Sequence, residues 1–375
     1  MPQVSIILPC LNEQASIGNC IRTIKKVISE NNLDAEIIAV DNASTDSSAK
    51  IIKSYDVKYV FEPKRGYGSA YLAGFKHAKG KYIIMADPDS TYDFNEIPKF
   101  LNKLENGYDF VIGNRFRGNI EKGSMSITHK YIGNPALSFL FKTFFRSRLG
   151  DIHCGFRAIK RTSLEKLSLN TLGMEFASEM VIKAKQNNLK IMEIPINYYK
   201  RVGKSKIHTF SDGWRHLRFM LIYAPTYLFL IPGILFLLLG TGLLILFMVG
   251  PVSFIGISFY NRPAILGSFL IILGYQIILL DIYTKTYMKS IKMIKTNRFI
   301  DFLAGCISFE SGIIIGVIIT FIGIILGIFE MSDWIIRGFP PLTSNTMLLV
   351  FTLAIIGIQT IFSVFFLSIL LVEKK

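Results

Sequence analysis

Two aspartates, Asp87 and Asp89, stand one residue apart directly after the short apolar run KYIIMA. Two carboxylates this close together are poor anion binders by themselves, because like charges repel. Mg²⁺, in contrast, is typically held by one or two carboxylates together with substrate phosphates. The pair therefore indicates a divalent metal ion between the carboxylates and a diphosphate, and a turn with a helix cap around Pro88 is the alternative interpretation.

Polar segments also follow four other apolar runs. PCLNE, DNASTD, EPKRGYGSA and GNRF come at the ends of VSIILP, EIIAV, VKYVF and FVIG. Segments of helical period separate the runs, and we expect the helix after EIIAV to open at Ser44 or Thr45. Short unbroken strands that alternate with helices indicate a mostly parallel sheet covered on both faces. Because ligands bind such sheets at the carboxyl ends of the strands, the polar segments are where chemistry is expected.

Two common nucleotide-binding loops are missing from the sequence. The first turn holds Pro9, Asn12 and Glu13 but no glycine, and the later GYGSAY lacks the third glycine of a dinucleotide fingerprint. No GxxxxGK[ST] phosphate loop occurs either. These absences argue against a dinucleotide-dependent dehydrogenase and a P-loop nucleotidase.

The remainder of the chain is much more apolar. Overall, 51% of the residues are hydrophobic and 18% are charged, against about 25% charged in an average soluble protein. Residues 1–221 hold 33 Lys or Arg and 21 Asp or Glu, a net charge of +12, and the rest carries +3. Four long uncharged runs lie in the second part, at Leu228–Val249, Pro263–Leu280, Ile313–Phe329 and Met347–Val372. Each is long enough to cross ~30 Å of hydrocarbon, so we predict four transmembrane helices in two hairpins.

Basic residues predict the orientation of these helices. The loop between the second and third runs holds Lys285, Lys289, Lys292, Lys295 and Arg298, whereas the other two loops hold only Arg262 and Arg337. Short loops rich in Lys and Arg stay on the cytoplasmic side. We therefore expect a multi-pass membrane protein whose globular domain and two termini are cytoplasmic.

The segment FSDGWRHLRFMLIYAP joins the two parts. Trp214, Leu217 and Met220 recur at helical spacing, opposite Arg215 and Arg218. Such an amphipathic helix suits a membrane surface. The alternative is an ordinary helix packed on the globular domain.

The segments PCLNE, DNASTD, ADPDSTYDF, GNRF, CGFRAIKR and KRVGKSKI, followed by this helix and the apolar runs, resemble the polyprenyl-phosphate glycosyltransferases. That family comprises the dolichol-phosphate mannose and glucose synthases and their undecaprenyl relatives, in the inverting glycosyltransferase family two. The resemblance covers residues 4 to about 221 and, more loosely, the two hairpins. It implies an α/β fold: a GT-A catalytic domain with a Rossmann-like, mostly parallel sheet at 1–210, an interface helix at 211–223 and four transmembrane helices at 224–375.

The resemblance also implies a donor site. The residues that match Asp87 and Asp89 bind Mg²⁺ or Mn²⁺ on the diphosphate of a nucleotide sugar. Thr91 stands where the family often has a glutamine near the metal, which puts a third protein ligand in doubt. The nucleotide pocket is matched by Pro9, Asn12, Glu13 and Asp41, and Arg65 is a candidate for the pyrophosphate.

The acceptor in this family is a lipid phosphate. A phosphate monoester is close to a dianion at pH 7, because its second pKa is about 6. It needs no general base, so positioning and electrostatics can carry catalysis, with Arg115 as the catalytic cation beside the two aspartates. The acceptor-phosphate ligands implied by the resemblance are Arg115, Lys130, Asn134, Arg157, Arg201, Ser205 and Lys206. Lys130 replaces the usual arginine of the family, so a point charge stands in for a bidentate contact.

We therefore expect a metal-dependent inverting hexosyltransferase. It would move glucose from UDP-glucose or mannose from GDP-mannose to polyprenyl or dolichyl phosphate at the cytoplasmic membrane face. The expected partners are the nucleotide sugar, the lipid phosphate and the bilayer, with no nucleic acid, and a homo-oligomer through the membrane domain stays open. The alternative function is a non-catalytic membrane protein that binds sugar nucleotides or takes part in translocating or assembling lipid-linked sugars.

Overall fold

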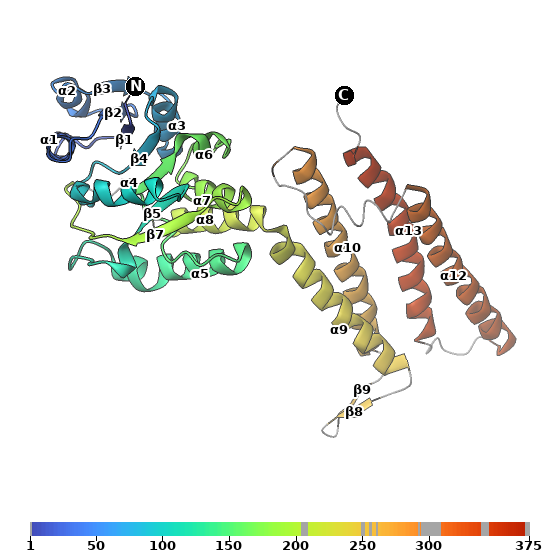
Figure 1. Cartoon of the computed structure of the whole chain (residues 1–375). Helices are drawn as coiled ribbons and strands as arrows, with labels where there is room; N and C mark the ends of the chain where they lie inside the picture. Colours follow the sequence, from blue (N-terminus) through green and yellow to red (C-terminus); the bar gives the residue numbers. More distant parts are fainter. Residues whose placement is uncertain are drawn as a thin grey trace. The chain divides into compact units, whose positions relative to one another are not determined.

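The computed structural model describes residues 2–203, 209–248, 252–254, 257–259, 262–291, 293, 309–338 and 345–371. The chain divides into two compact units, Met1–Tyr223 and Ala224–Lys375. Each unit is described by itself (Figure 1).

The first unit is built on a seven-stranded sheet with the order β3-β2-β1-β4-β6-β5-β7 (Figure 1). Its strands are β1 (Val4–Cys10), β2 (Ala35–Asp41), β3 (Lys58–Phe61), β4 (Tyr82–Met85), β5 (Phe110–Asn114), β6 (Arg157–Lys160) and β7 (Ile191–Pro195). Only β6 runs antiparallel to its neighbours, β4 and β5. The predicted mostly parallel sheet is confirmed, and the five apolar runs form β1 to β5.

Helices follow most of the strands. They are α1 (Ile17–Glu30), α2 (Ser48–Lys53), α3 (Tyr67–His77), α4 (Ile97–Glu105), α5 (Asn134–Phe145), α6 (Arg161–Glu165), α7 (Phe176–Gln186) and α8 (Thr209–Tyr223). Three shorter helical turns are η1 (Phe94–Glu96), η2 (Arg115–Arg117) and the π-helical η3 (His129–Gly133). In α1, Ile17, Ile21 and Ile24 are fully buried, as their spacing predicts.

The helix after β2 begins later than predicted. It starts at Ser48 rather than at Ser44 or Thr45. The Ser44 N–H donates to the Asp41 carboxylate and the Thr45 N–H to Asn12 Oδ1, at 3.0 and 2.7 Å. Side-chain acceptors thus hold these backbone groups in a loop and compete with helix formation.

Helix α8 buries a different stripe from the one predicted. Asp212, His216 and Met220 face the interior of the first unit, where α8 packs against α5 and α7. Trp214 is 55% exposed and lies on the outer side with Arg215 and other exposed residues. One stripe of this helix packs on the domain, while a tryptophan and arginines remain outside, and the membrane-surface interpretation stays a prediction.

Where the structure describes the second unit, it consists of helices and one short hairpin. Its long helices are α9 (Ile231–Met248), preceded by the π-helical turn η4 (Thr226–Leu230), α10 (Arg262–Ser290), α12 (Phe309–Ile336) and α13 (Thr346–Leu371), and the hairpin is β8 (Val252–Phe254) with β9 (Ile257–Phe259). All four spans are long and apolar enough to cross a membrane, with a hydropathy of 2.2 to 2.9. The four predicted spans are confirmed, and α9 pairs with α10 and α12 with α13 (Figure 1).

Polar groups join the two helix pairs. Helix α10 packs against α13, and Ser268 bonds Thr352 while Tyr275 bonds Thr360, each at 2.6 Å between hydroxyl oxygens. In hydrocarbon such hydroxyl pairs replace water as partners and fix which helices meet.

Glycines allow α9 and α10 to approach closely. A Cβ on Gly267 would lie 2.8 Å from the carbonyl oxygen of Gly240, and a Cβ on Gly240 would lie 2.6 Å from that of Gly267. Gly233 and Gly274 form a similar contact further along the same helices. Small residues at such contacts are typical of helix packing in membranes.

We expect Gly267→Leu to lower the melting temperature of the detergent-solubilised chain. Overpacking of this kind costs about 1–3 kcal/mol or more, because backbone rather than a flexible side chain must move. Gly242→Leu is the matched control, since nothing lies within 4 Å of a Cβ at that position. Thermal unfolding followed by size-exclusion chromatography measures both, and equal melting temperatures would contradict the close glycine contact.

Candidate active site

The loops after β1 and β2 are tied together at the carboxyl edge of the sheet. The Asn12 N–H donates to Ser44 Oγ at 3.0 Å, and the Glu13 N–H donates to Ser48 Oγ at 2.8 Å. These bonds place Asn12 and Glu13 next to the loop that follows Asp41, the last residue of β2. Pro9 lies in β1, just before Asn12 and Glu13. Four of the predicted nucleotide-site residues thus come together, and their role stays a prediction.

Asp41 is 2% exposed and already has hydrogen-bond donors within the protein. One of its oxygens accepts from the Ser44 N–H and the other from the Tyr59 hydroxyl, both at 3.0 Å. Burial and the hydrogen bond to Asp41 raise the pKa of Tyr59 to about 12. Arg65 lies over the same loop, where its Nη2 donates to the Ala43 carbonyl at 3.2 Å.

Asp87 and Asp89 follow β4, and Asp89 is buried whereas Asp87 is partly exposed. Burial and, after it, the nearby Asp89 carboxylate raise the pKa of Asp87 to about 7. Asp89 Oδ1 accepts from the Thr91 N–H at 3.1 Å and from the Thr91 hydroxyl at 2.5 Å. Thr91, which replaces the expected glutamine, therefore orients Asp89.

The donor atoms of this pair fit a divalent metal ion. Two crowded carboxylates favour a cation between them, and together with substrate phosphates they form a usual Mg²⁺ ligand set. Within the described part of the chain, no group of three or more His, Cys, Asp or Glu side chains could hold a metal by protein ligands alone. Any metal here would therefore depend on the substrate for its remaining ligands.

Arg201 was predicted to bind the acceptor phosphate, but its guanidinium lies against carboxylates on the donor side. Its Nη1 is 2.8 Å from Asp89 Oδ2, and its Nη2 pairs with Glu13 Oε1. The backbone on either side is attached to the same loop, because the Tyr199 N–H donates to the Thr91 carbonyl and the Val202 N–H to that of Asp89. Ser205 and Lys206, predicted for the same segment, lie outside the described residues.

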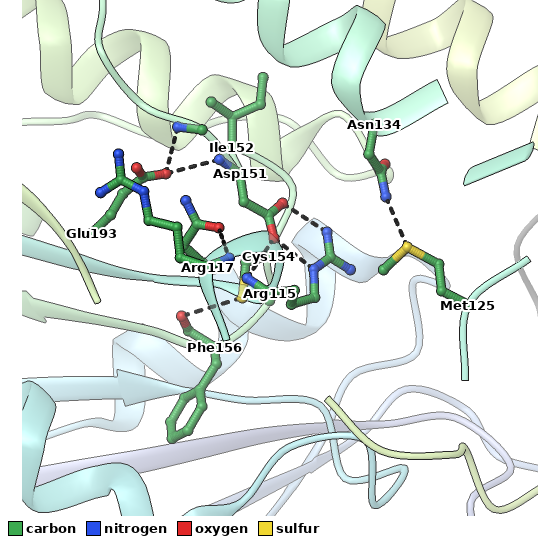
Figure 2. Close-up of polar contacts among 12 residues, drawn as sticks. Arg115, Arg117, Met125, Asn134, Asp151, Ile152, Cys154, Phe156 and Glu193 are labelled. Atoms are coloured by element: carbon green, nitrogen blue, oxygen red, sulfur yellow. Dashed lines mark hydrogen bonds and ion pairs between the residues drawn. The ribbon is translucent and has the colours of Figure 1, made fainter. Parts of the chain in front are cut away.

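Arg115 is held rigidly at the end of β5. Its Nε and Nη2 contact the two oxygens of Asp151 at 2.7 and 2.8 Å, and its backbone N–H donates to the same carboxylate (Figure 2). Asp151 is fully buried and Arg115 is 7% exposed. Glu193 in turn accepts from the backbone N–H groups of Gly150 and Asp151. A bidentate pair of this kind fixes the direction of the guanidinium.

Lys130 and Asn134 lie on η3 and at the start of α5. Figure 2 shows Asn134 with its Nδ2 directed at Met125 Sδ, a contact of 3.6 Å. Burial and the positive charge of Arg115 lower the pKa of His129, so η3 lies within the electrostatic reach of Arg115. Three of the predicted acceptor residues therefore lie in the same part of the domain.

Arg157, which was predicted to bind the acceptor phosphate, has its guanidinium inside the domain, and its role at the acceptor stays a prediction. The residue is 1% exposed. Its Nε, Nη1 and Nη2 donate to the carbonyls of Cys154, Ala177 and Ile152 at 2.7, 2.9 and 2.8 Å. A buried guanidinium must satisfy its donors, and here backbone carbonyls do so. Arg157 thus supports the loop that carries Asp151.

Two tyrosines that sequence reasoning missed connect the two halves of the site. The centroid of the Tyr198 ring lies 5.3 Å from the guanidinium carbon of Arg115. It lies 5.7 Å from the centroid of the Tyr92 ring. Burial raises the pKa of Tyr198. The positive charge of Arg115 lowers this pKa, and the negative charges of Asp89 and Asp87 raise it further. Tyr198 therefore lies in the field of both the carboxylates and the arginine. The signal in the sequence was the aromatic pair NYYKR before the basic segment.

Exposed apolar side chains gather on the segment of η3 and α5. Ile127, Tyr131, Ile132 and Phe139 are 77%, 67%, 67% and 66% exposed. Exposed Lys142 and Arg146 follow on the same segment. We call these six residues the basic-apolar surface.

A buried histidine pair attaches α8 to the domain. Ser178 Oγ lies 2.9 Å from His216 Nδ1 and 3.4 Å from His153 Nε2, and the two imidazole rings are 4.4 Å apart. Burial lowers the pKa of His216 to about 4, with Asp212 acting against it and Arg157 adding to it. Burial also lowers the pKa of His153 well below its ordinary value, helped by the charges of His216, Arg115 and Arg157. Both rings are therefore neutral at pH 7.

This pair predicts a loss of stability in acid. An unfolded histidine titrates near pH 6.5, so below that pH the unfolded chain binds a proton that folded His216 binds only near pH 4. His216 should thus lower the free energy of unfolding by about 3 kcal/mol at most as the pH drops from about 6.5 to about 4, and His153 adds to this loss. Melting temperatures of the full chain between pH 7.5 and 4.5 measure this. We expect His216→Asn to flatten the decline and the control His77→Asn to keep it, and identical pH profiles in all three proteins would contradict the prediction.

Comparison with known proteins bears on both units. Residues 5–168 match the family model described as glycosyl transferase family 2, and residues 282–371 match the glycosyltransferase family 2 C-terminal transmembrane region. The chain is 35% identical over 369 residues to the low-salt glycan biosynthesis hexosyltransferase Agl6 of Haloferax volcanii, covering 98% of this chain and 89% of that one. It is 27% identical over 211 residues to a dolichyl-phosphate hexose transferase of the same organism, covering 56% and 89%.

Two further similarities are more distant. The chain is 28% identical over 226 residues to the dolichol-phosphate mannosyltransferase of Pyrococcus furiosus, covering 57% of this chain and 62% of that one. A crystal structure of a mycobacterial protein superposes with a TM-score of 0.50 at 16% identity, covering 60% and 75%. At this identity the structural likeness concerns the fold alone.

Proposed function

This chain belongs to glycosyltransferase family 2, and from that premise we propose that it transfers a hexose from a nucleotide sugar to a polyprenyl or dolichyl phosphate. One observation carries the proposal. The Asp87 carboxylate and the Tyr92 hydroxyl both lie against Gly155. The Tyr92 ring contacts the Tyr198 ring, which lies 5.3 Å from the Arg115 guanidinium. The donor diphosphate and the acceptor phosphate are both anions, so the carboxylates would act on the diphosphate through a bound metal ion, whereas Arg115 would act on the acceptor phosphate directly.

On the donor side we assign Mg²⁺ or Mn²⁺ to Asp87 and Asp89. When bound, the metal ion would neutralise the charge that develops on the departing nucleoside diphosphate. Asp41, Glu13 and Asn12 would contact the nucleoside, because they meet at the carboxyl edge of β1 and β2. UDP-glucose and GDP-mannose are both candidate donors, because a carboxylate can accept a hydrogen bond from an N–H of uracil or of guanine.

On the acceptor side we assign the lipid phosphate to Arg115, Lys130 and Asn134. A phosphate oxygen attacks the anomeric carbon as the bond from that carbon to the diphosphate breaks, and the nucleoside diphosphate leaves with the electron pair. No proton has to be removed, because the acceptor is close to a dianion at pH 7. Attack opposite the leaving group inverts the anomeric configuration and gives a β-linked product.

Several features support a lipid acceptor at the cytoplasmic face. The four apolar helices make this a membrane protein, and the basic-apolar surface and the outer side of α8 carry the aromatic and basic residues that suit a bilayer surface. The basic residues between the second and third apolar runs support a cytoplasmic catalytic domain, because the positive-inside rule keeps such segments on the cytoplasmic side.

A donor panel tests the proposal. Membranes that contain the chain are incubated with labelled UDP-glucose or GDP-mannose, polyprenyl phosphate and Mg²⁺ or Mn²⁺, and organic-soluble label is counted. We expect one donor to give product only when metal and lipid phosphate are both present. Absence of product with both donors, while the chain still binds UDP or GDP, would support the non-catalytic alternative.

A further inference from the structure

The positive charge beside the candidate metal ligands comes from the chain itself. The Arg201 guanidinium bridges Asp89 and Glu13, which belong to the loops after β4 and β1. These carboxylates are 7% and 9% exposed, and the arginine is 21% exposed. Because this pair is largely shielded from water, the attraction between its charges is screened much less than in a surface pair.

The contacts of Asp89 leave no vacant oxygen for a metal ion. Oδ1 accepts two hydrogen bonds from Thr91, and Oδ2 pairs with Arg201. The bonds to Thr91 lie within one loop and are compatible with a metal on the other oxygen. The bond to Arg201 is not, because an arginine and a metal ion on the same oxygen would repel each other.

We propose that Arg201 acts as an internal counter-cation that competes with the metal ion for Asp89. Metal binding then requires the guanidinium to move away. The free energy needed to break its two ion pairs opposes metal binding and so weakens the metal affinity. A nucleotide diphosphate would overcome this cost by adding its own ligands to the metal and by offering Arg201 a new anion. The metal would therefore bind weakly alone and tightly with nucleotide.

The geometry allows the guanidinium to leave. Its Nε is buried without a hydrogen-bond partner among the described residues, so the side chain is not fully satisfied where it lies. Gly203, two residues later, has a φ of +96° with nothing within 4 Å of an added Cβ. A buried donor without a partner carries a desolvation penalty, which makes the present position of the guanidinium less stable and its departure easier.

The proposal rests on the proposed metal site, and direct metal binding tests the two separately. Mn²⁺ alone is titrated into the full chain in detergent at constant pH, without nucleotide, and free Mn²⁺ is measured by electron paramagnetic resonance. We expect Arg201→Ala and Arg201→Gln to bind Mn²⁺ at least about tenfold more tightly than the unmodified chain, equivalent to about 1.4 kcal/mol. Arg201→Lys, which keeps the charge, should stay close to the unmodified chain.

Lys200→Ala is the matched control. It removes one positive charge from the adjacent, exposed residue and leaves the ion pairs of Arg201 in place. If the Arg201 variants bind no more tightly than the unmodified chain while Asp89→Asn loses Mn²⁺, the counter-cation proposal is wrong and the metal site stands. If Asp89→Asn binds Mn²⁺ as the unmodified chain does, the metal assignment is wrong and the proposal falls with it. An equal gain in Lys200→Ala would show a general charge effect and would also overturn it.

Discussion

Replacing Asp89 with asparagine is expected to lower hexosyl transfer to lipid phosphate about 10³-fold, which corresponds to about 4 kcal/mol of lost transition-state stabilisation. The amide can still accept the hydrogen bonds that Thr91 donates to Asp89, so the loop should keep its shape. What disappears is the negative charge that would hold a metal ion against the diphosphate. We expect the loss mainly in kcat, because the departing charge develops during the reaction.

The test compares initial rates at saturating donor and lipid phosphate for Asp89→Asn, Asp87→Asn and a control. Asp93→Asn is a suitable control, because Asp93 lies in the same loop and its carboxylate only accepts from Asn95 next to η1. We expect both metal-site variants to be inactive and the control to remain within a few-fold of the unmodified chain. An Asp89→Asn protein with normal transfer would refute the role of Asp89 in catalysis.

The five polar segments could be identified in the sequence as candidate site loops because they follow strands that are apolar throughout. Asp41, Asp87 and Arg115 each come at the carboxyl end of such a strand, and parallel strands must bring these ends to one edge of the sheet. Local spacing together with a general rule of sheets was thus enough to predict the fold and to group the site. Strands β6 and β7 escaped because neither forms a long apolar run, and β6 begins with the buried Arg157.

The roles of individual arginines could not be read in the same way. Arg115, Arg157 and Arg201 were all predicted to bind the acceptor phosphate, yet the first pairs with Asp151, the second with backbone carbonyls and the third with Asp89. Asp151 and Asp89 are separated from their arginines by 36 and 112 residues, and the most distant of the three carbonyls that Arg157 contacts is 20 residues away. A guanidinium takes whichever acceptors the fold brings to it, so its role depends on tertiary contacts that spacing does not encode.

The outer side of α8 illustrates the same limit. Periodicity identified an amphipathic helix, but two faces of similar character competed for the domain. His216 decided between them, because it meets Ser178 and His153 in the interior and so turns Trp214 outward. A polar contact between distant residues thus set the rotation of a helix whose existence was evident from local sequence.

The second large effect concerns Arg115 and separates its structural part from its part in transfer. Arg115→Ala would leave the fully buried Asp151 carboxylate without its bidentate partner. Removal of one member of such a pair costs about 3–5 kcal/mol, because the remaining charge stays buried and uncompensated. We expect the melting temperature to fall sharply, and loss of transfer in this variant alone would not show what Arg115 does.

The double variant Arg115→Met with Asp151→Asn resolves this. It removes both charges, keeps an acceptor for the Arg115 backbone N–H and retains most of the buried volume, so much of the lost stability should return. Transfer should nevertheless stay about 10²–10³-fold below normal, because no fixed cation would face the acceptor phosphate.

Arg117→Met serves as control for the Arg115 variants, since Arg117 is exposed in the same turn. Melting temperatures and initial rates at varied lipid phosphate distinguish the outcomes. A double variant that is stable and fully active would confine Arg115 to a structural role. A stable double variant that has lost transfer assigns the cation to the reaction, because the fold then persists without it while the chemistry does not.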